Sequence, residues 1–210
     1  MKVKPAVFLI RIKDNPVSMW EAGRTYERWT EKGFSVNLVD AYTPETYHNS
    51  PYKLNFELKR NKTNVVREFT ESEKAVFFSH LAALDIAKRK ASPSIIIEHD
   101  AKLIGDIPEE ILKQRIAPLG HAIRDGKQSI LPCLAYMITP ELAGYFVEDL
   151  TLRTITLNID GYMWEFANSY AGPEQVYDYM LNVQQNEEFR EELGTTIDHG
   201  KRDHLPRDQW

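Results

Sequence analysis

In the stretch Ser94-Ile-Ile-Ile-Glu-His-Asp-Ala101, three isoleucines lead directly into two carboxylates and an imidazole. A short, uninterrupted apolar run is typical of a strand buried on both faces, as in a parallel sheet covered by helices. Open α/β sheets bind their ligands at the carboxyl ends of the strands. Because side chains alternate along a strand, Glu98 and Asp100 are expected to project to one side and His99 to the other. The stretch therefore predicts a central strand with a functional site at its end.

The N-terminal part of the chain has a β-α-β pattern. Residues 6–12 are expected to form a strand, residues 17–32 a helix and residues 34–39 a second strand. Gly33 stands where a helix ends. Short connections after each element imply a parallel sheet.

A helix is predicted immediately before the isoleucine strand. Thr70 and Glu73 have the spacing of a capping box, in which each side chain satisfies a backbone donor at the start of a helix. Apolar residues at helical spacing follow over 75–88, and Ser92-Pro93 ends the pattern. The segment 42–69 is expected to be an irregular excursion from the sheet.

The remaining elements are predicted from weaker patterns. Residues 102–128 are expected to be a loop containing an amphipathic helix near 108–116, and residues 130–138 a strand followed by a helix over 140–150. Further predictions are an extended segment at 152–159 and helical segments at 174–185 and 187–193.

Composition limits the classes of function. The chain has 210 residues, a formal net charge of -5 and 27% charged residues. This balance argues against nucleic-acid binding that depends on bulk positive charge. The single cysteine, Cys133, allows no internal disulfide, and no transmembrane segment is predicted. We expect one domain over 1–210, in the cytoplasm.

The acidic strand end has a possible chemical role. Carboxylate oxygens suit Mg²⁺ or Mn²⁺, so Glu98 and Asp100 are candidate cation ligands. Such a cation could neutralise charge on a departing diphosphate. The alternative is an ordinary solvated loop at the end of a strand.

Four other residues are candidates with equally ordinary alternatives. His80 is either a functional group or a satisfied histidine on a helix face. His199 or His204 could fold back as a third metal ligand, or both could belong to a solvated tail. Asp160 could be a general base or a plain turn aspartate.

Two segments of the chain form a recognisable combination: Phe69-Thr-Glu-Ser-Glu-Lys-Ala-Val-Phe-Phe-Ser-His-Leu-Ala-Ala-Leu84 and Ser94-Ile-Ile-Ile-Glu-His-Asp-Ala-Lys-Leu103. Together they resemble glycosyltransferase family 25, the lipopolysaccharide-type galactosyl- and glucosyltransferases related to the collagen galactosyltransferases. The family pattern is a helix that starts with a Thr- and Glu-bearing turn and reaches a Ser-His pair, followed by a strand ending in Glu-Asp-Asp. The positions that match this pattern are Glu73, Ser79, His80, Glu98 and Asp100. Looser similarities involve Leu134–Ala143, Asp160 and Thr195–Ile197.

The resemblance implies a GT-A-like α/β fold with a mainly parallel central sheet flanked by helices. It implies transfer of a hexose, with inversion, from a nucleotide sugar (usually UDP-linked) to a hydroxyl of a glycan, lipid-linked or protein acceptor. A divalent cation, Mn²⁺ or Mg²⁺, would assist.

The residue roles follow from the same resemblance. Asp100 is expected to be the principal metal ligand, with His99 and His199 as further ligands. His99 replaces the middle aspartate of the family pattern, which removes one negative charge. The expected donor contacts are Glu73, His80 and Glu98, and Asp160 is the expected base.

Two other functions remain compatible with the residues. One is a non-catalytic nucleotide- or sugar-binding protein that keeps the fold. The other is a metal-dependent phosphoester hydrolase that uses the same acids.

Overall fold

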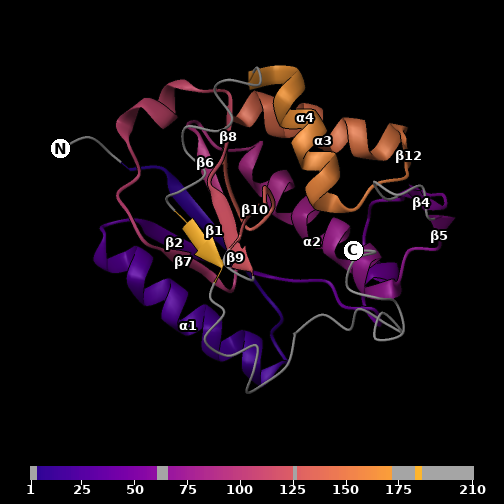
Figure 1. Ribbon diagram of the computed structural model, residues 1–210, viewed down its shortest axis with the longest axis horizontal. Helices are drawn as coiled ribbons and strands as arrows, with labels where there is room; N and C mark the ends of the chain where they lie inside the picture. The colour runs from indigo at the N-terminus through magenta and orange to yellow at the C-terminus, as the bar shows by residue number, and fades with distance from the viewer. Residues whose placement is uncertain (1–3, 61–65, 125–126, 172–182, 186–210) are drawn as a thin grey trace.

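The structure is a computed structural model that describes residues 4–60, 66–124, 127–171 and 183–185. A mixed sheet in the order β2-β1-β6-β11-β8 forms its centre, with helices on both faces (Figure 1). The described part of the chain has no helix long and apolar enough to span a bilayer.

The predicted β-α-β unit is confirmed. Strand β1 (Ala6–Arg11) leads through helix α1 (Pro16–Glu31) to strand β2 (Ser35–Asp40), which pairs parallel to β1. The side chain of Asn15 accepts a hydrogen bond from the backbone of Ser18 and caps α1. Gly33 adopts φ = 79°, a left-handed conformation that glycine accepts without strain.

The isoleucine run forms the predicted buried strand. Strand β6 (Ser94–Glu98) pairs parallel to β1, and Ile95, Ile96 and Ile97 are 0% exposed. On its other side β6 pairs antiparallel with β11 (Ala135–Ile138), which pairs antiparallel with β8 (Ile116–Pro118). Strand β8 thus runs in the same direction as β6. The mainly parallel expectation holds for this sheet, with β11 as the reversed strand.

One face of the main sheet is covered by α2 (Glu71–Ala87), α3 (Pro140–Leu152) and α4 (Ile159–Ala171), as Figure 1 shows. The Thr70–Glu73 capping box at the start of α2 is present in both directions, as predicted. Phe8, Ile96 and Tyr136 project from the sheet into the core beneath these helices.

The other face packs against α1 and a second sheet in the order β10-β9-β13-β7. Val7, Leu9, Ile95 and Ile97 enter this second core, where Trp29 of α1 is fully buried. The strands of the second sheet are β7 (Ala101–Leu103), β9 (Gly120–Arg124), β10 (Lys127–Ile130) and β13 (Val183–Gln185).

In its described residues, 42–60 and 66–69, the excursion after β2 forms short elements. Their bounds are η1 (Tyr47–Asn49), β3 (Asn55–Phe56), β4 (Lys59–Arg60) and β5 (Val66–Arg67). Strand β3 pairs parallel with β12 (Thr154–Ile155), while β4 and β5 pair with each other.

Three of the weaker predictions are wrong. In place of the loop and helix expected over 102–128, the described residues of this range form strands β7, β8 and β9, the start of β10, and a 3-10 turn, η2 (Glu109–Lys113). These strands are only three to five residues long. Strands β7 and β8 pair with β13 and β11, which lie further along the chain, whereas β9 pairs with β13 and also with its neighbour β10. Local periodicity carries little signal in such short strands.

The segment 130–138 is also not one strand, because β10 ends at Ile130 and β11 starts at Ala135. Residues 183–185 form β13 instead of the end of a helix, and 172–182 and 187–193 lie outside the described residues. Helix α4 was not predicted at all. The Asp160-Gly161 pair resembles a turn, but Asn158 Oδ1 accepts a hydrogen bond from Gly161 N at 3.0 Å in the first turn of α4.

Gly120 lies where a side chain does not fit. A Cβ added there would lie 2.6 Å from the Leu131 carbonyl oxygen and 2.7 Å from Leu134 Cβ. We expect Gly120→Ala to lower the free energy of unfolding by about 2 kcal/mol, measured by urea denaturation. Gly144→Ala is the control, because nothing lies within 4 Å of a Cβ at this helical position. That variant is expected to gain up to about 1 kcal/mol. Equal stabilities of the two variants would contradict the packing described here.

Candidate functional site

The carboxyl ends of the parallel strands meet at one edge of the main sheet. Glu98 ends β6 and pairs in register with Ile10, one residue before the end of β1. At the same edge, Arg11 Nε of β1 donates to Asp40 Oδ1 of β2 at 3.1 Å. The acidic group predicted at a strand end therefore lies where open α/β sheets carry their ligands.

The two carboxylate oxygens of Asp100 have different surroundings. Its Oδ2 accepts a hydrogen bond from Gln185 Nε2 of β13 at 2.8 Å. Its Oδ1 is buried and has no hydrogen-bond partner among the described residues, although the residue as a whole is partly exposed. Burial raises the pKa of the Asp100 carboxyl against the opposing effect of His99, and the neighbouring Glu98 carboxylate raises it further. A buried carboxylate oxygen without a donor is a suitable position for a cation.

Helix α1 holds the backbone that follows β6. Thr25 Oγ1 donates to the carbonyl of His99 at 2.7 Å, and Trp29 Nε1 donates to the carbonyl of Ala101 at 3.1 Å. The prediction that Glu98 and Asp100 lie on one side by strand alternation does not apply, because β6 ends at Glu98 and residues 99–100 form a turn. His99 is partly buried at this turn.

His80 reaches the strand end from α2. The imidazole is 1% exposed, and its Nε2 lies 3.4 Å from Glu98 Oε1. Its Nδ1 lies 3.1 Å from the hydroxyl of Tyr136 on β11. Two of the predicted donor contacts, His80 and Glu98, are therefore in contact with each other.

Asp160 lies in the first turn of α4 and not in an isolated turn. Its Oδ1 accepts a hydrogen bond from the backbone N–H of Cys133 at 3.0 Å. Burial raises the pKa of the Cys133 thiol well above its usual value, and the Asp160 and Glu98 carboxylates raise it further. The Asp160 and Glu98 carboxylates therefore both act electrostatically on one buried thiol, which lies in the segment before β11.

Glu73, the third predicted donor contact, is engaged elsewhere. Its carboxylate pairs with Lys59 Nζ at 2.6 Å and with Arg67 at 2.6 and 2.8 Å, and it caps Thr70 N. Burial opposes ionisation of Glu73, yet the hydrogen bonds from Arg67 and Lys59 outweigh it and lower the pKa from 4.5 to about 2. This network ties the β4–β5 hairpin to the start of α2.

The predicted metal ligands are only partly described. Asp100 and His99 are adjacent at the strand end, whereas His199 and His204 lie outside the described residues. In the described ranges, no three His, Cys, Asp or Glu side chains stand close enough together to hold a metal ion. Asp100 with Glu98 or His99 would supply at most a partial set of ligands, which is the usual protein share when substrate phosphates complete the coordination of Mg²⁺.

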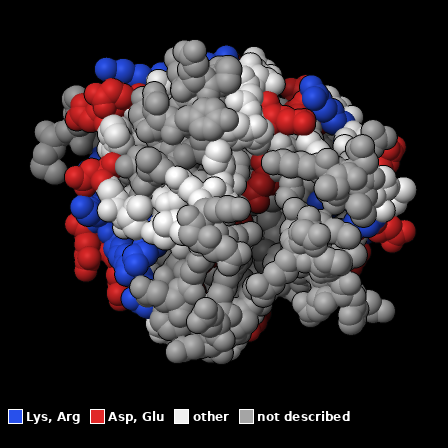
Figure 2. Space-filling view, viewed as in Figure 1, with Lys and Arg blue, Asp and Glu red and all other residues white. Residues whose placement is uncertain are grey.

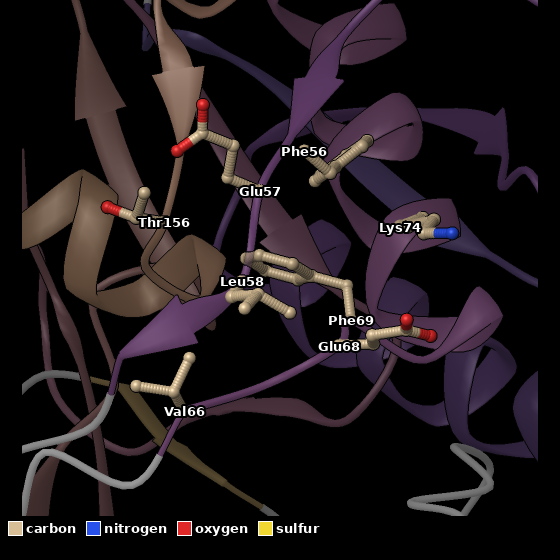
Figure 3. Close-up of a pocket in the computed structure, with 8 residues that line it drawn as sticks. All are labelled: Phe56, Glu57, Leu58, Val66, Glu68, Phe69, Lys74 and Thr156. Carbon is tan, nitrogen blue, oxygen red and sulfur yellow. The ribbon is translucent and has the colours of Figure 1, made fainter.

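A recess of about 670 Å³ lies beside β4 and β5 (Figure 3). Its lining combines aromatic, aliphatic and charged side chains: Phe56, Glu57, Leu58, Val66, Glu68, Phe69, Lys74 and Thr156. None of these belongs to the Glu98–Asp100 cluster. On the face shown in Figure 2, the acidic and basic side chains of the described residues are intermixed, without one large basic patch among them.

Sequence reasoning missed two residues of this site, Gln185 and Tyr136. Gln185 was expected in a helix, and no local pattern marks it as a partner of Asp100. Tyr136 did carry a signal: it is the one hydroxyl in Leu134-Ala-Tyr-Met-Ile138, and a buried tyrosine hydroxyl usually finds a hydrogen-bond partner.

No protein-family model and no curated protein sequence matches this chain. The resemblance of residues 69–103 to glycosyltransferase family 25 therefore remains an interpretation of the motif itself.

Proposed function

We propose that this chain is a glycosyltransferase that transfers a hexose from a nucleotide sugar to an acceptor hydroxyl, with inversion and with the help of Mn²⁺ or Mg²⁺. The observation that carries the proposal is the buried Oδ1 of Asp100, just after the end of strand β6. No hydrogen-bond donor among the described residues reaches this oxygen. The motif over residues 69–103 favours a nucleotide sugar as the ligand and a GT-A type of sheet as the scaffold.

The residues at the strand end fit a divalent cation. Asp100 Oδ1 would be the first ligand, with the Glu98 carboxylate and the His99 imidazole next to it. Carboxylate oxygens are ligands that Mg²⁺ and Mn²⁺ prefer, and His99 would add a nitrogen ligand. A cation bound there would neutralise negative charge on the departing diphosphate. Gln185, which holds Oδ2 at 2.8 Å, would keep the other oxygen of Asp100 oriented.

The reaction itself is a direct displacement. The acceptor oxygen forms a bond to the anomeric carbon, the bond from that carbon to the diphosphate oxygen breaks, and a carboxylate takes the proton of the acceptor hydroxyl. Asp160 is the candidate base, since Cys133 N–H holds its Oδ1 and thereby fixes its orientation. Glu98, held by His80, would contact the donor or the cation.

Thermal stabilisation by nucleotide sugars, with and without Mn²⁺, tests the proposal. A ligand that binds only the folded state raises the free energy of unfolding by about 2.7 kcal/mol at a concentration of 100 Kd. We expect one nucleotide sugar, of the UDP-linked kind that the family resemblance implies, to raise the melting temperature. The rise should be larger when Mn²⁺ is present. Product analysis should then show a released nucleoside diphosphate.

Other outcomes point to the other functions. A shift that occurs without Mn²⁺ and without turnover would indicate a binding protein. Release of phosphate from simple phosphoesters would indicate a hydrolase. No shift with any nucleotide sugar would contradict the proposal.

A further inference from the structure

A buried chain of polar groups leads from β11 to the acidic strand end. The hydroxyl of Tyr136 lies 3.1 Å from Nδ1 of His80, and Nε2 of His80 lies 3.4 Å from Oε1 of Glu98. Tyr136 is 0% and His80 1% exposed, and their rings stack with centroids 5.8 Å apart. Two fully buried side chains thus connect a neighbouring strand to Glu98, which is itself partly exposed.

The backbone fixes the geometry of this chain. Tyr136 pairs in register with Ile96, and Glu98 follows Ile96 by two residues, so Tyr136 and Glu98 project from the same face of the sheet. Glu98 N–H donates to the carbonyl of Leu134 at 2.9 Å, which locks the two strands together next to the site. Helix α2 covers this face and supplies His80 between them.

The chemistry of the three groups sets the direction of the hydrogen bonds. An ionised carboxylate only accepts, so Nε2 of His80 must carry the proton that points to Glu98. In a neutral imidazole Nδ1 is then an acceptor, and Tyr136 must donate to it. Burial raises the pKa of the Tyr136 hydroxyl well above its usual value, with Cys133 and Glu98 adding to the rise, so this proton is retained.

We propose that Tyr136 is a positioning residue, which holds His80 in the Nε2–H tautomer and through it orients the Glu98 carboxylate. The effect on catalysis rests on the proposed glycosyltransferase function, whereas the tautomer does not. Partners of this kind, one step removed from a ligand or a metal, orient the groups that make direct contact.

The imidazole ¹⁵N chemical shifts of the full chain test the tautomer directly. In the wild-type protein, with His80→Gln used to assign the signals, we expect a pyrrole-like Nε2 and a pyridine-like Nδ1. Tyr136→Phe keeps the ring but removes the donor, so the two His80 signals should move toward the averaged values of mixed tautomers. Two pyrrole-like nitrogens in the wild-type protein, or unchanged signals in Tyr136→Phe, would overturn the proposal.

Tyr162→Phe is the matched control. Tyr162 also donates a buried hydroxyl proton to a partner, Asp149 Oδ2 at 2.6 Å, but on α4 and α3 and not at the strand end. This variant should leave the His80 signals unchanged, although its melting temperature should fall by about as much as that of Tyr136→Phe. A change of the His80 signals in both variants would show a general structural effect and would contradict a specific role of Tyr136.

Turnover of the nucleotide sugar distinguishes a failure of this inference from a failure of the proposed function. We expect Tyr136→Phe to lower kcat/KM for the nucleotide sugar by about 10-fold, as is usual for an outer hydrogen-bond partner, while Tyr162→Phe changes it little. If the wild-type protein turns over no nucleotide sugar but shows the predicted tautomer, the glycosyltransferase proposal fails and the arrangement stands. Unchanged kcat/KM in Tyr136→Phe, together with measurable wild-type turnover, would refute the catalytic role of Tyr136.

Discussion

Asp100→Asn is expected to lower nucleotide-sugar turnover by about 100-fold or more, because charge stabilisation by a bound cation is worth several kcal/mol and each 1.36 kcal/mol is a factor of ten. The amide keeps the shape of the side chain and can still accept the hydrogen bond of Gln185 Nε2, now 2.8 Å from Oδ2. What it loses is the negative charge at the enclosed Oδ1. The measurement is initial-rate kinetics with the donor identified by thermal shift, at several Mn²⁺ concentrations.

The stability of this variant provides an internal check. Because Asp100 Oδ1 is buried without a donor among the described residues, its charge is costly in the absence of a cation. Asp100→Asn should therefore melt no lower than the wild-type protein, and Mn²⁺ should no longer raise its melting temperature. Asp106→Asn is the control, since the Asp106 side chain is 88% exposed and pairs with Lys32 at the surface. Unchanged turnover in Asp100→Asn would refute the metal-centred mechanism.

Glu73→Gln is expected to lower the free energy of unfolding at neutral pH by about 3 kcal/mol, the range found when one partner of a buried ion pair is removed. The Glu73 and Lys59 side chains are 11% and 10% exposed, and the substitution removes the carboxylate that faces the Lys59 ammonium. Glu71→Gln is the control, because Glu71 lies two residues earlier in the same turn of α2 and its side chain is 52% exposed. This substitution should cost less than about 1 kcal/mol. Urea denaturation of the three proteins measures these differences.

The pH dependence of the Glu73 effect has a defined sign. The folded-state pKa of Glu73 is about 2, below the ordinary value of 4.5, so its contribution is present above pH 4.5 and is lost as the pH falls toward 2. Glutamine does not titrate, and the difference between the wild-type protein and Glu73→Gln should shrink over this window. A variant that keeps its stability but no longer binds the donor would show instead that Glu73 is the donor contact suggested by the motif.

The parts of the fold that were predictable carry their information locally. The isoleucine run predicts β6 because a short, β-branched apolar run is typical of a strand buried on both faces. The Thr70–Glu73 box and Gly33 mark helix ends because specific backbone groups must be satisfied there. In contrast, β13 pairs with β7 and β9, and its pairing with β9 joins Gly120 to Val183. No window of local sequence contains both partners of such a pair.

The residues of the candidate site also divide into those that local sequence marks and those that distant elements supply. Glu98 and Asp100 were marked by their place after a buried strand, and His80 by its place in the capped helix. The contacts that define the site come from elsewhere: Tyr136 from a reversed strand, Gln185 from β13, and the Cys133 backbone at Asp160. A strand pattern indicates which side chains are buried, but not which distant element they meet.

Because β11 follows β6 in the sequence, one edge of β6 stays unpaired for part of the time that the chain is being synthesised. Strand β6 pairs with β1 on one edge, which is already available, but its other edge pairs with Ala135–Ile138. Until the ribosome has released residue 138, Ile95, Ile96 and Ile97 lie in a strand with an open edge, and such a hydrophobic edge is prone to pair with other chains. A fragment that stops before β11 is therefore expected to aggregate.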